Sequence, residues 1–414
     1  MTTVPSHSSP GGGSLLRSRT LLLAGFWLTV AVVWAQFIST SFRVAHDFPL
    51  GYSWSEMLVN YQGGFVRRGL FGEILYRLDD LVSVRFLMPA IVCLLYLATM
   101  TWLVVLAFRI GTFAALLFLF SPGTVIFPIY EYVAFARKDV FVFAALMAAA
   151  AIAVYAPRRY ALAMLMAVYF VAGLFVEVAW FYFPLAVAMF LNRQGEGTST
   201  GWQVATMVAA DAYLLACLAF SVLIGVGTPA MVDAIVASWQ AKHPGAFDVF
   251  YRPNFLFLTF RQGLQMVIDR ASSARTASGQ VLGFVLTAAP LVLLVNDLKQ
   301  RTKPGFLIRL WTFGSFCAMA LAYAVGADWG RYTHFFAIHT FVYLAVTREP
   351  RPRPPPAPGN EGRENLVWIA CALVLLLYAT TWRLAHVVPA GELSIYPGSL
   401  QRLFGAVSPV FDRY

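Results

Sequence analysis

Apolar residues occur along the chain in long runs that short polar segments separate. The clear runs cover residues 21–42, 86–108, 112–130, 140–156, 204–227, 281–295, 310–326, 332–346 and 366–382. A helix needs about 20 apolar residues, with a lower limit of about 17, to cross a bilayer. The pattern therefore predicts an all-α protein, a polytopic bundle of transmembrane helices. The shorter runs, such as 281–295, leave half-length or buried helices open.

One further run, residues 160–191, contains a single charge, Glu177, near its middle. It is either one tilted helix or two short helices that meet at Glu177. The positive-inside rule favours two helices, which give about eleven membrane segments with the N-terminus in the cytoplasm. The cytoplasmic segments then carry 14 cations and five acids, against 16 cations and 14 acids on the other side. These cytoplasmic segments are 1–20, 109–111, 157–159, 192–203, 296–309 and 347–365.

This topology predicts the domain organisation. The expected parts are a disordered cytoplasmic tail (1–20), a bundle (21–346) with outer loops 43–85 and 228–280, a Pro-rich cytoplasmic linker (347–365), a last span (366–382) and an extracytoplasmic tail (383–414). Amphipathic stretches in both outer loops predict interfacial helices, and Thr228-Pro229 marks the start of one of them.

The amino-acid composition excludes several classes of protein. The chain is 59% hydrophobic and 12% charged, whereas soluble domains are about 25% charged. Soluble enzymes, disulfide scaffolds and disordered proteins are therefore excluded. The net charge of +10 is scattered over short loops, which favours a positive-inside bias and not a nucleic-acid partner. The 26 arginines against four lysines, with abundant alanine, indicate a bacterial protein, and we expect it in the inner membrane.

Three carboxylates are candidate catalytic acids or bases: Asp47, Glu131 and Glu177. Asp47 directly follows the first span, where it would accept a proton from an acceptor hydroxyl. The alternative for Asp47 is an ordinary pair with Arg43. Glu177 needs a partner because a charge at membrane depth is costly, and a buried ion pair with Arg137 or Arg331 is the structural alternative to a catalytic role.

Arg67 and Arg68 lie between glycines, in Gly-Gly-Phe-Val-Arg-Arg-Gly, at the start of an amphipathic stretch. Adjacent guanidinium groups at a helix N-terminus suit a phosphate. The alternative is contact with lipid headgroups, with Glu73 and Arg77 as an ordinary i,i+4 pair. Further candidates for substrate or phosphate binding stand in outer turns: Arg137, Lys138, Asp328, Arg331 and His334.

Simpler roles remain open for these outer turns. Asp139 is expected to cap the next helix, and Asp328 and Arg331 are close enough in sequence to pair with each other. Two cations in one outer turn, Arg137 and Lys138, need compensation, from a phosphate or from Glu131 with Glu177.

The layout resembles the GT-C class of polytopic glycosyltransferases. The resemblance rests on about eleven spans, the acid Asp47 after the first span, amphipathic helices in the first outer loop and a larger outer loop later. It implies transfer of a sugar from a polyprenyl-phosphate carrier to a lipid-linked or cell-envelope glycan acceptor on the outer face. In that class the first outer loop bears a catalytic acid, which would be Asp47. This chain has no adjacent Asp-Glu pair there, a departure from the common form.

The resemblance implies a polyprenyl-phosphate-linked sugar, a glycan acceptor and membrane lipids as partners, and no nucleotide cofactor. We expect no metal site, although a divalent metal held by Asp47 and Glu131 stays open. Arginines in the outer loops, such as Arg252 and Arg261, are also similar to those of O-antigen polymerases. A transporter or flippase would instead use Asp211, Glu177 and His339 as a path. A non-catalytic membrane partner is a further alternative.

Overall fold

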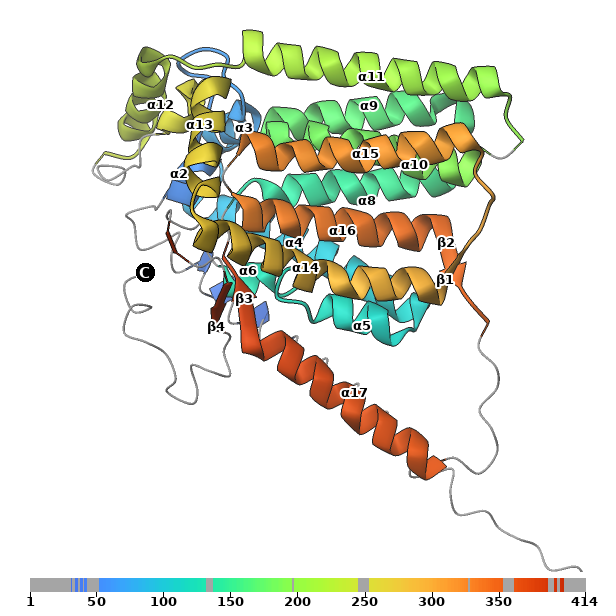
Figure 1. The fold of residues 1–414 in the computed structure, drawn as a ribbon. Coiled ribbons are helices and arrows are strands. Elements are labelled where there is room, and N and C mark those ends of the chain that lie inside the picture. The colour runs from blue at the N-terminus through green and yellow to red at the C-terminus, as the bar shows by residue number, and fades with distance from the viewer. Residues whose placement is uncertain are drawn as a thin grey trace, which may run out of the picture.

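The computed structural model describes residues 52–131, 137–195, 197–244, 253–326, 328–352, 361–385, 391–392 and 395–397, and a few isolated residues between 31 and 42. The described chain is mainly helical, and most of its long helices run side by side along one axis (Figure 1). This confirms the all-α prediction. Five helices are long and apolar enough to cross a membrane by length and composition: Val84–Ile110, Arg158–Phe175, Thr200–Leu223, Ala274–Asp297 and Phe306–Ala324.

The bundle is built from elements that follow the predicted apolar runs. They are α4 (Val84–Ile110), α5 (Phe113–Leu119), α6 (Phe127–Tyr130), α8 (Asp139–Tyr155), α9 (Arg158–Phe175), α10 (Phe183–Gln194), α11 (Thr200–Leu223), α14 (Ala274–Asp297), α15 (Phe306–Val325), α16 (Trp329–Thr347) and α17 (Glu361–Thr381). Helix α16 lies inside the bundle, where Phe335, Ile338, Phe341 and Val342 are fully buried.

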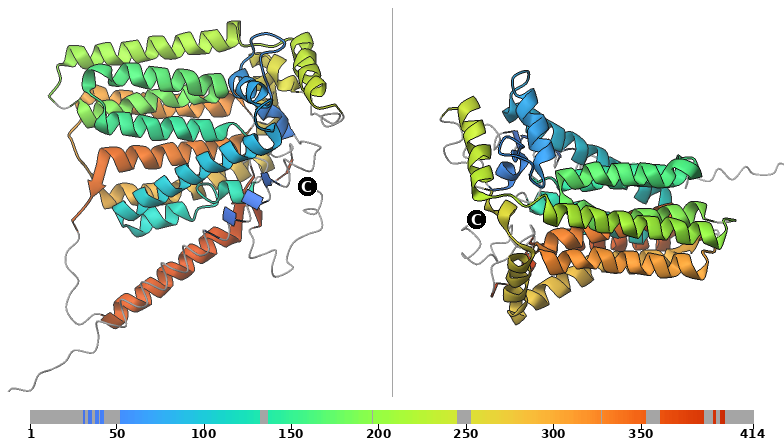
Figure 2. Two further views of the ribbon diagram at one scale, coloured as in Figure 1. Left: turned by 180° about the vertical axis from the view of Figure 1, so that it is seen from behind. Right: turned by 90° about the horizontal axis from the view of Figure 1, so that it is seen from above.

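The two ends of the bundle differ. The loop end, defined here by α2 (Tyr52–Met57), α3 (Gly69–Leu78), α12 (Pro229–Lys242) and α13 (Phe260–Ala271), carries the connections that were expected outside (Figures 1 and 2). The opposite end carries β1 (Leu298–Gln300) and β2 (Arg348–Pro350), which pair antiparallel. At this β1–β2 end lie the connections after α4, α8, α10, α14 and α16, all of which were expected in the cytoplasm.

The run 160–191 forms two helices, as predicted. Helix α9 ends at Phe175, Val176 is extended with φ −157°, and a 3₁₀ turn η1 (Glu177–Tyr182) leads into α10. Gly173 permits this break, because a Cβ there would lie 2.0 Å from the Trp180 ring. Pro184 stands in the first turn of α10, where a proline costs the helix no hydrogen bond.

The run 112–130, expected as one span, is instead broken. Helix α5 has only seven residues, and a turn at 121–124 separates it from α6. Pro122 cannot continue the helix, and a Cβ at Gly123 would lie 2.1 Å from Oγ1 of Thr287 in α14. The turn therefore lets α14 approach closely.

The C-terminal boundaries also need correction. Helix α17 begins at Glu361, inside the segment expected as a linker without a helix, and β2 occupies the start of that segment. A second small sheet, β3 (Trp382–Leu384) with β4 (Ile395–Pro397), follows α17 and was not anticipated.

The helices of the loop end begin as expected. Helix α3 is amphipathic and starts at Gly69, and α12 starts after Thr228, whose side chain accepts a hydrogen bond from the Met231 amide. Helix α12 packs on the α2–α3 segment, where Trp239 Nε1 donates to the Leu58 carbonyl at 2.7 Å.

Candidate functional site

Charged side chains gather at the loop end, where the N-termini of α8 and α16, the turn η1 and the α2–α3 segment meet. Arg68 is central to the group. Its Nε and Nη2 donate to the two carboxylate oxygens of Glu177, at 2.6 and 2.7 Å, and its Nη1 donates to Glu56 at 2.6 Å. A guanidinium that binds carboxylates on two sides is held in one orientation, and its charge is compensated.

Arg68 also has an unusual backbone. Its φ of 65° places it in the left-handed region as the N-cap of α3, and it is the only non-glycine residue with positive φ in the described chain. Such a conformation costs free energy unless the surroundings hold it. The hydrogen bonds to the carboxylates of Glu56 and Glu177 stabilise this backbone conformation. The Arg68 guanidinium also stacks over Phe255, 5.0 Å from the ring centroid.

Two further arginines extend the group toward α16. Arg137 donates to Glu56 and to Asp328, both at 3.0 Å. Arg331 contacts Asp328 through Nη1, and its Nε lies 2.7 Å from Asp139. These contacts join seven side chains in a row, which we call the ion-pair chain: Glu177, Arg68, Glu56, Arg137, Asp328, Arg331 and Asp139.

Lys138 lies beside the ion-pair chain and is fully buried. Its Nζ donates to the carbonyl of Arg68. Burial disfavours the ammonium and lowers the pKa of Lys138 to about 7, although Glu56 acts in the opposite direction. Burial alone would raise the pKa of Glu56, but Arg137 and Arg68 hold that pKa at about 2. Glu56 is therefore ionised at neutral pH, whereas Lys138 titrates there.

Arg67 connects the site to the segment between α12 and α13. Its Nη2 donates to the carbonyls of Phe255 and Leu258 at 2.8 and 3.1 Å, and its Nη1 lies 3.9 Å from Glu177. The 3₁₀ turn η2 (Asn254–Phe257) is thereby held against the site. Among the described residues, the site brings five basic and four acidic side chains together.

Most of the residues predicted for the site do meet here. They are Arg67, Arg68, Arg137, Lys138, Glu177, Asp328 and Arg331. His334 lies apart from them, buried on α16 with its Nδ1 3.2 Å from the Gly123 carbonyl and its ring stacked on Phe127. Glu131 follows α6 and is half-buried. Asp47 lies outside the described residues.

Several pairings differ from expectation. Glu177 pairs with Arg68 and not with Arg137 or Arg331. Asp139 is the first residue of α8, makes no cap and faces Arg331 instead. Arg137 is compensated by Glu56 and Asp328. The pairs Asp328–Arg331 and Glu73–Arg77 are confirmed.

Glu56 is the residue that sequence reasoning missed. Its carboxylate is 1% exposed and bridges Arg68 and Arg137. The available signal was a lone acid among Trp54, Met57, Leu58 and Val59, all of which are buried. An acid in such surroundings requires a cation.

The chemistry open to this arrangement is anion binding and charge stabilisation. The acids of the ion-pair chain are engaged by guanidinium groups, and a carboxylate with a pKa of about 2, such as Glu56, is a weak base at neutral pH. Lys138 can gain or lose a proton near neutrality. Within the described residues no three histidine, cysteine or acidic side chains converge as metal ligands. Comparison with protein-family models, with curated proteins and with solved structures finds no match to this chain.

Proposed function

We propose that this protein is an integral membrane glycosyltransferase that moves a sugar from a polyprenyl-phosphate carrier to a lipid-linked or cell-envelope glycan acceptor on the extracytoplasmic face. The observation that carries the proposal is the group of oriented cations Arg67, Arg68 and Lys138 at one end of an apolar bundle. A phosphate departing from the sugar would be stabilised by such a site.

The membrane arrangement belongs to the same proposal: about eleven segments in the bacterial inner membrane, with the N-terminus in the cytoplasm and the loop end outside. The grouping of the Arg-rich connections at the β1–β2 end supports it. In a background without native cysteines, Leu81→Cys, at a residue 80% exposed, should react with an impermeant thiol reagent in spheroplasts. Gly305→Cys, where a side chain meets nothing within 4 Å, should react only after permeabilisation. Reversed labelling would overturn the orientation.

In the proposed reaction, Asp47 takes the proton of the acceptor hydroxyl while the acceptor oxygen bonds to the anomeric carbon. The bond between that carbon and the phosphate oxygen breaks, and the phosphate leaves with the electron pair. Arg67 and Arg68 hold the phosphate, with Lys138 and Arg331 nearby. Glu177 and Glu56 then act by orienting Arg68, because both are bound to its guanidinium. Glu131 is the second candidate base.

The direct test supplies purified protein with a polyprenyl-phosphate sugar and measures glycan product. Asp47→Asn should fold and make no product. Arg68→Lys should lower product formation about ten- to a hundredfold, because lysine loses the planar fork and with it a contact of about 1.5–3 kcal/mol. Arg77→Lys is the matched control, since the Arg77 side chain is 77% exposed. Full activity of Arg68→Lys would overturn the role given to Arg68.

Two alternatives are outcomes of the same test. Product formed only with a lipid-linked oligosaccharide as both donor and acceptor would identify an O-antigen-type polymerase. Flux of lipid or ions across liposomes without product would identify a transporter. The described residues favour the enzyme over the transporter, because Asp211 is exposed on the surface of α11 while His339 is buried against Tyr182.

A further inference from the structure

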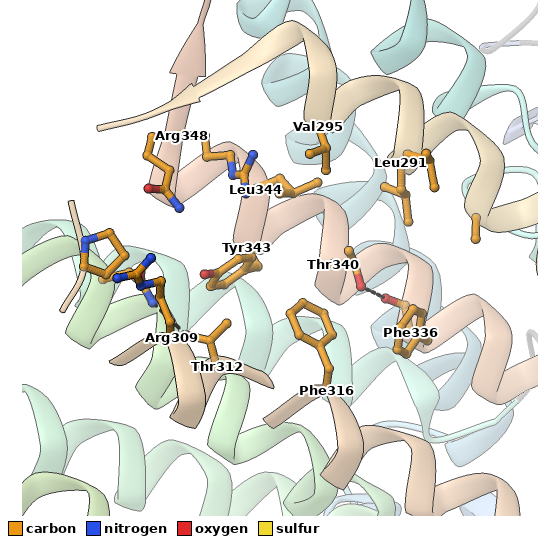
Figure 3. A pocket seen from close by; sticks show the side chains of 15 residues that line it. Leu291, Val295, Arg309, Thr312, Phe316, Phe336, Thr340, Tyr343, Leu344 and Arg348 are labelled. Atoms are coloured by element: carbon orange, nitrogen blue, oxygen red, sulfur yellow. Dashed lines mark hydrogen bonds between the residues drawn. The ribbon is translucent and has the colours of Figure 1, made fainter. Parts of the chain in front are cut away.

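A cavity of about 380 Å³ lies at the β1–β2 end, between α14, α15 and α16 (Figure 3). This volume falls in the range of about 300–1,000 Å³ that small-molecule sites occupy. The cavity lies along the helices away from the ion-pair site. Most of its lining residues belong to the second half of α14, to α16 from Phe336 onward, to the first part of α15, or to β1 and β2.

The lining is divided along its length. The polar part, Arg309 and Arg348, lies close to the helix ends, and Gln300 of β1 also lines the cavity. The mainly apolar part, Leu291, Phe316 and Phe336 with Thr340 beside it, lies deeper along the bundle (Figure 3). From Phe336 to Thr347, its last residue, α16 rises by about 17 Å at about 1.5 Å per residue. A ligand that fills the cavity is thus elongated, with a polar and an apolar end.

The polar part carries two positive charges and no negative one. No acidic residue lines the cavity, and within the described residues neither Arg309 nor Arg348 forms an ion pair. The neighbouring acid Glu349 is taken by Lys299 at 3.0 Å and by Arg301 at 3.8 Å. Two guanidinium groups in a partly enclosed space favour an anion, and phosphate oxygens match their fork geometry.

The cavity is bordered by exposed hydrophobic side chains of α14, a candidate membrane span. Val292 and Val295 both line the cavity and are 64% and 37% exposed. Apolar side chains so exposed on a spanning helix face hydrocarbon. The ligand that suits both parts has a phosphate at headgroup level and a hydrocarbon chain beside it.

We propose that this cavity binds an anionic phospholipid of the leaflet at the β1–β2 end. Its phosphate lies between Arg309 and Arg348, and one acyl chain follows the apolar wall toward Leu291 and Phe336. This assignment does not rest on the proposed enzymatic activity, and it adds a lipid site at the end opposite the ion-pair chain.

The test measures phosphatidylglycerol bound to the purified full-length protein in detergent, with phosphatidylcholine and inorganic phosphate as separate probes. The double variant Arg309→Gln, Arg348→Gln should weaken phosphatidylglycerol binding at least tenfold. The matched control Arg158→Gln, Arg159→Gln removes two charges from the same end, where these arginines lie against Trp202 and Tyr160 outside the cavity. It should leave binding within about twofold. Equal losses in both double variants would overturn the site, because general surface charge would then explain binding.

A second pair of variants tests the hydrocarbon part and avoids the packed core. Val292→Trp fills the border of the cavity from an exposed position, and Val285→Trp places the same side chain two helical turns earlier, at a residue 54% exposed. Only Val292→Trp should weaken phosphatidylglycerol binding, again at least tenfold. If Val292→Trp has no effect and inorganic phosphate displaces the lipid, the site binds a free anion and the lipid assignment is wrong. Equal binding of phosphatidylcholine would also overturn it.

Discussion

The two ends of the bundle use the same residue types in opposite ways. At the loop end, Arg68, Arg137 and Arg331 each contact two carboxylates. At the β1–β2 end, Arg309 and Arg348 contact none within the described residues. Cations joined to acids are fixed in orientation by the protein itself, whereas cations without acids can turn toward a ligand. The charge excess of a segment therefore indicates its side of the membrane but not its role.

Two glutamates make this difference measurable. Glu56 and Glu349 each meet two cations, Arg68 and Arg137 in one case and Lys299 and Arg301 in the other. The Glu56 side chain is 1% exposed and that of Glu349 is 39% exposed. A charge removed from water must be matched by its partners, while an exposed charge is screened.

The largest effect is expected for Glu56→Gln. The variant keeps the shape of the side chain but leaves Arg68 and Arg137 with less compensation in a buried place. Breaking a buried pair in this way costs about 3–5 kcal/mol, so folded protein and the melting temperature in detergent should fall sharply. A variant with wild-type stability would show that the ion-pair chain does not stabilise the loop end.

A backbone contact at the same end should give the next largest effect. A Cβ at Gly72 of α3 would lie 2.0 Å from the Val59 carbonyl oxygen, so Gly72→Ala forces two backbone segments apart and should destabilise the fold by about 1–3 kcal/mol. The control Gly314→Ala, on α15 with nothing within 4 Å, should be neutral or stabilise by up to about 1 kcal/mol. The free energy of unfolding in detergent separates the two, and equal effects would contradict close packing of α3.

Part of this organisation could be predicted from the sequence. The break at Glu177, the amphipathic helix after Arg68 and the helix start at Thr228 all depend on neighbours within a few residues, and local patterns report such features. The turn that divides 112–130 was also signalled, by Pro122 and Gly123, but the apolar character of the run concealed it.

The pairing of charges could not be predicted. Arg68 reaches Glu177 across 109 positions, and Arg137 reaches Asp328 across 191. Which acid meets which cation is decided by how the ends of α8, α16 and η1 pack, and a list of charged residues does not contain that information. Glu56 was missed for the same reason, because its cation partners Arg68 and Arg137 lie 12 and 81 positions away in the sequence.

A pH dependence should distinguish Lys138 from other cations of the loop end. Its pKa is lowered from 10.5 to about 7 by burial, so between pH 7 and about pH 10 the unfolded chain binds a proton that the folded chain does not. Stability should therefore rise with pH across this window. In Lys138→Met, stability should rise less with pH than in the wild type. In Lys242→Met, which removes the ion pair with Asp80, stability should rise with pH as in the wild type. Parallel curves for wild type and Lys138→Met from pH 7 to 9.5 would contradict the lowered pKa.

The smallest effect is expected at the β1–β2 end, for Glu349→Gln. Lys299 and Arg301 lose their carboxylate partner, but both are well exposed and water replaces the lost contact. The melting temperature in detergent should remain unchanged within error at low and at high salt, in contrast to Glu56→Gln. Phosphatidylglycerol binding should hold or strengthen slightly, because the acid next to Arg348 is gone and the local potential becomes more positive. A marked loss of stability in Glu349→Gln would mean that this end is held together by charge pairs as the loop end is, and the contrast between the two ends would fail.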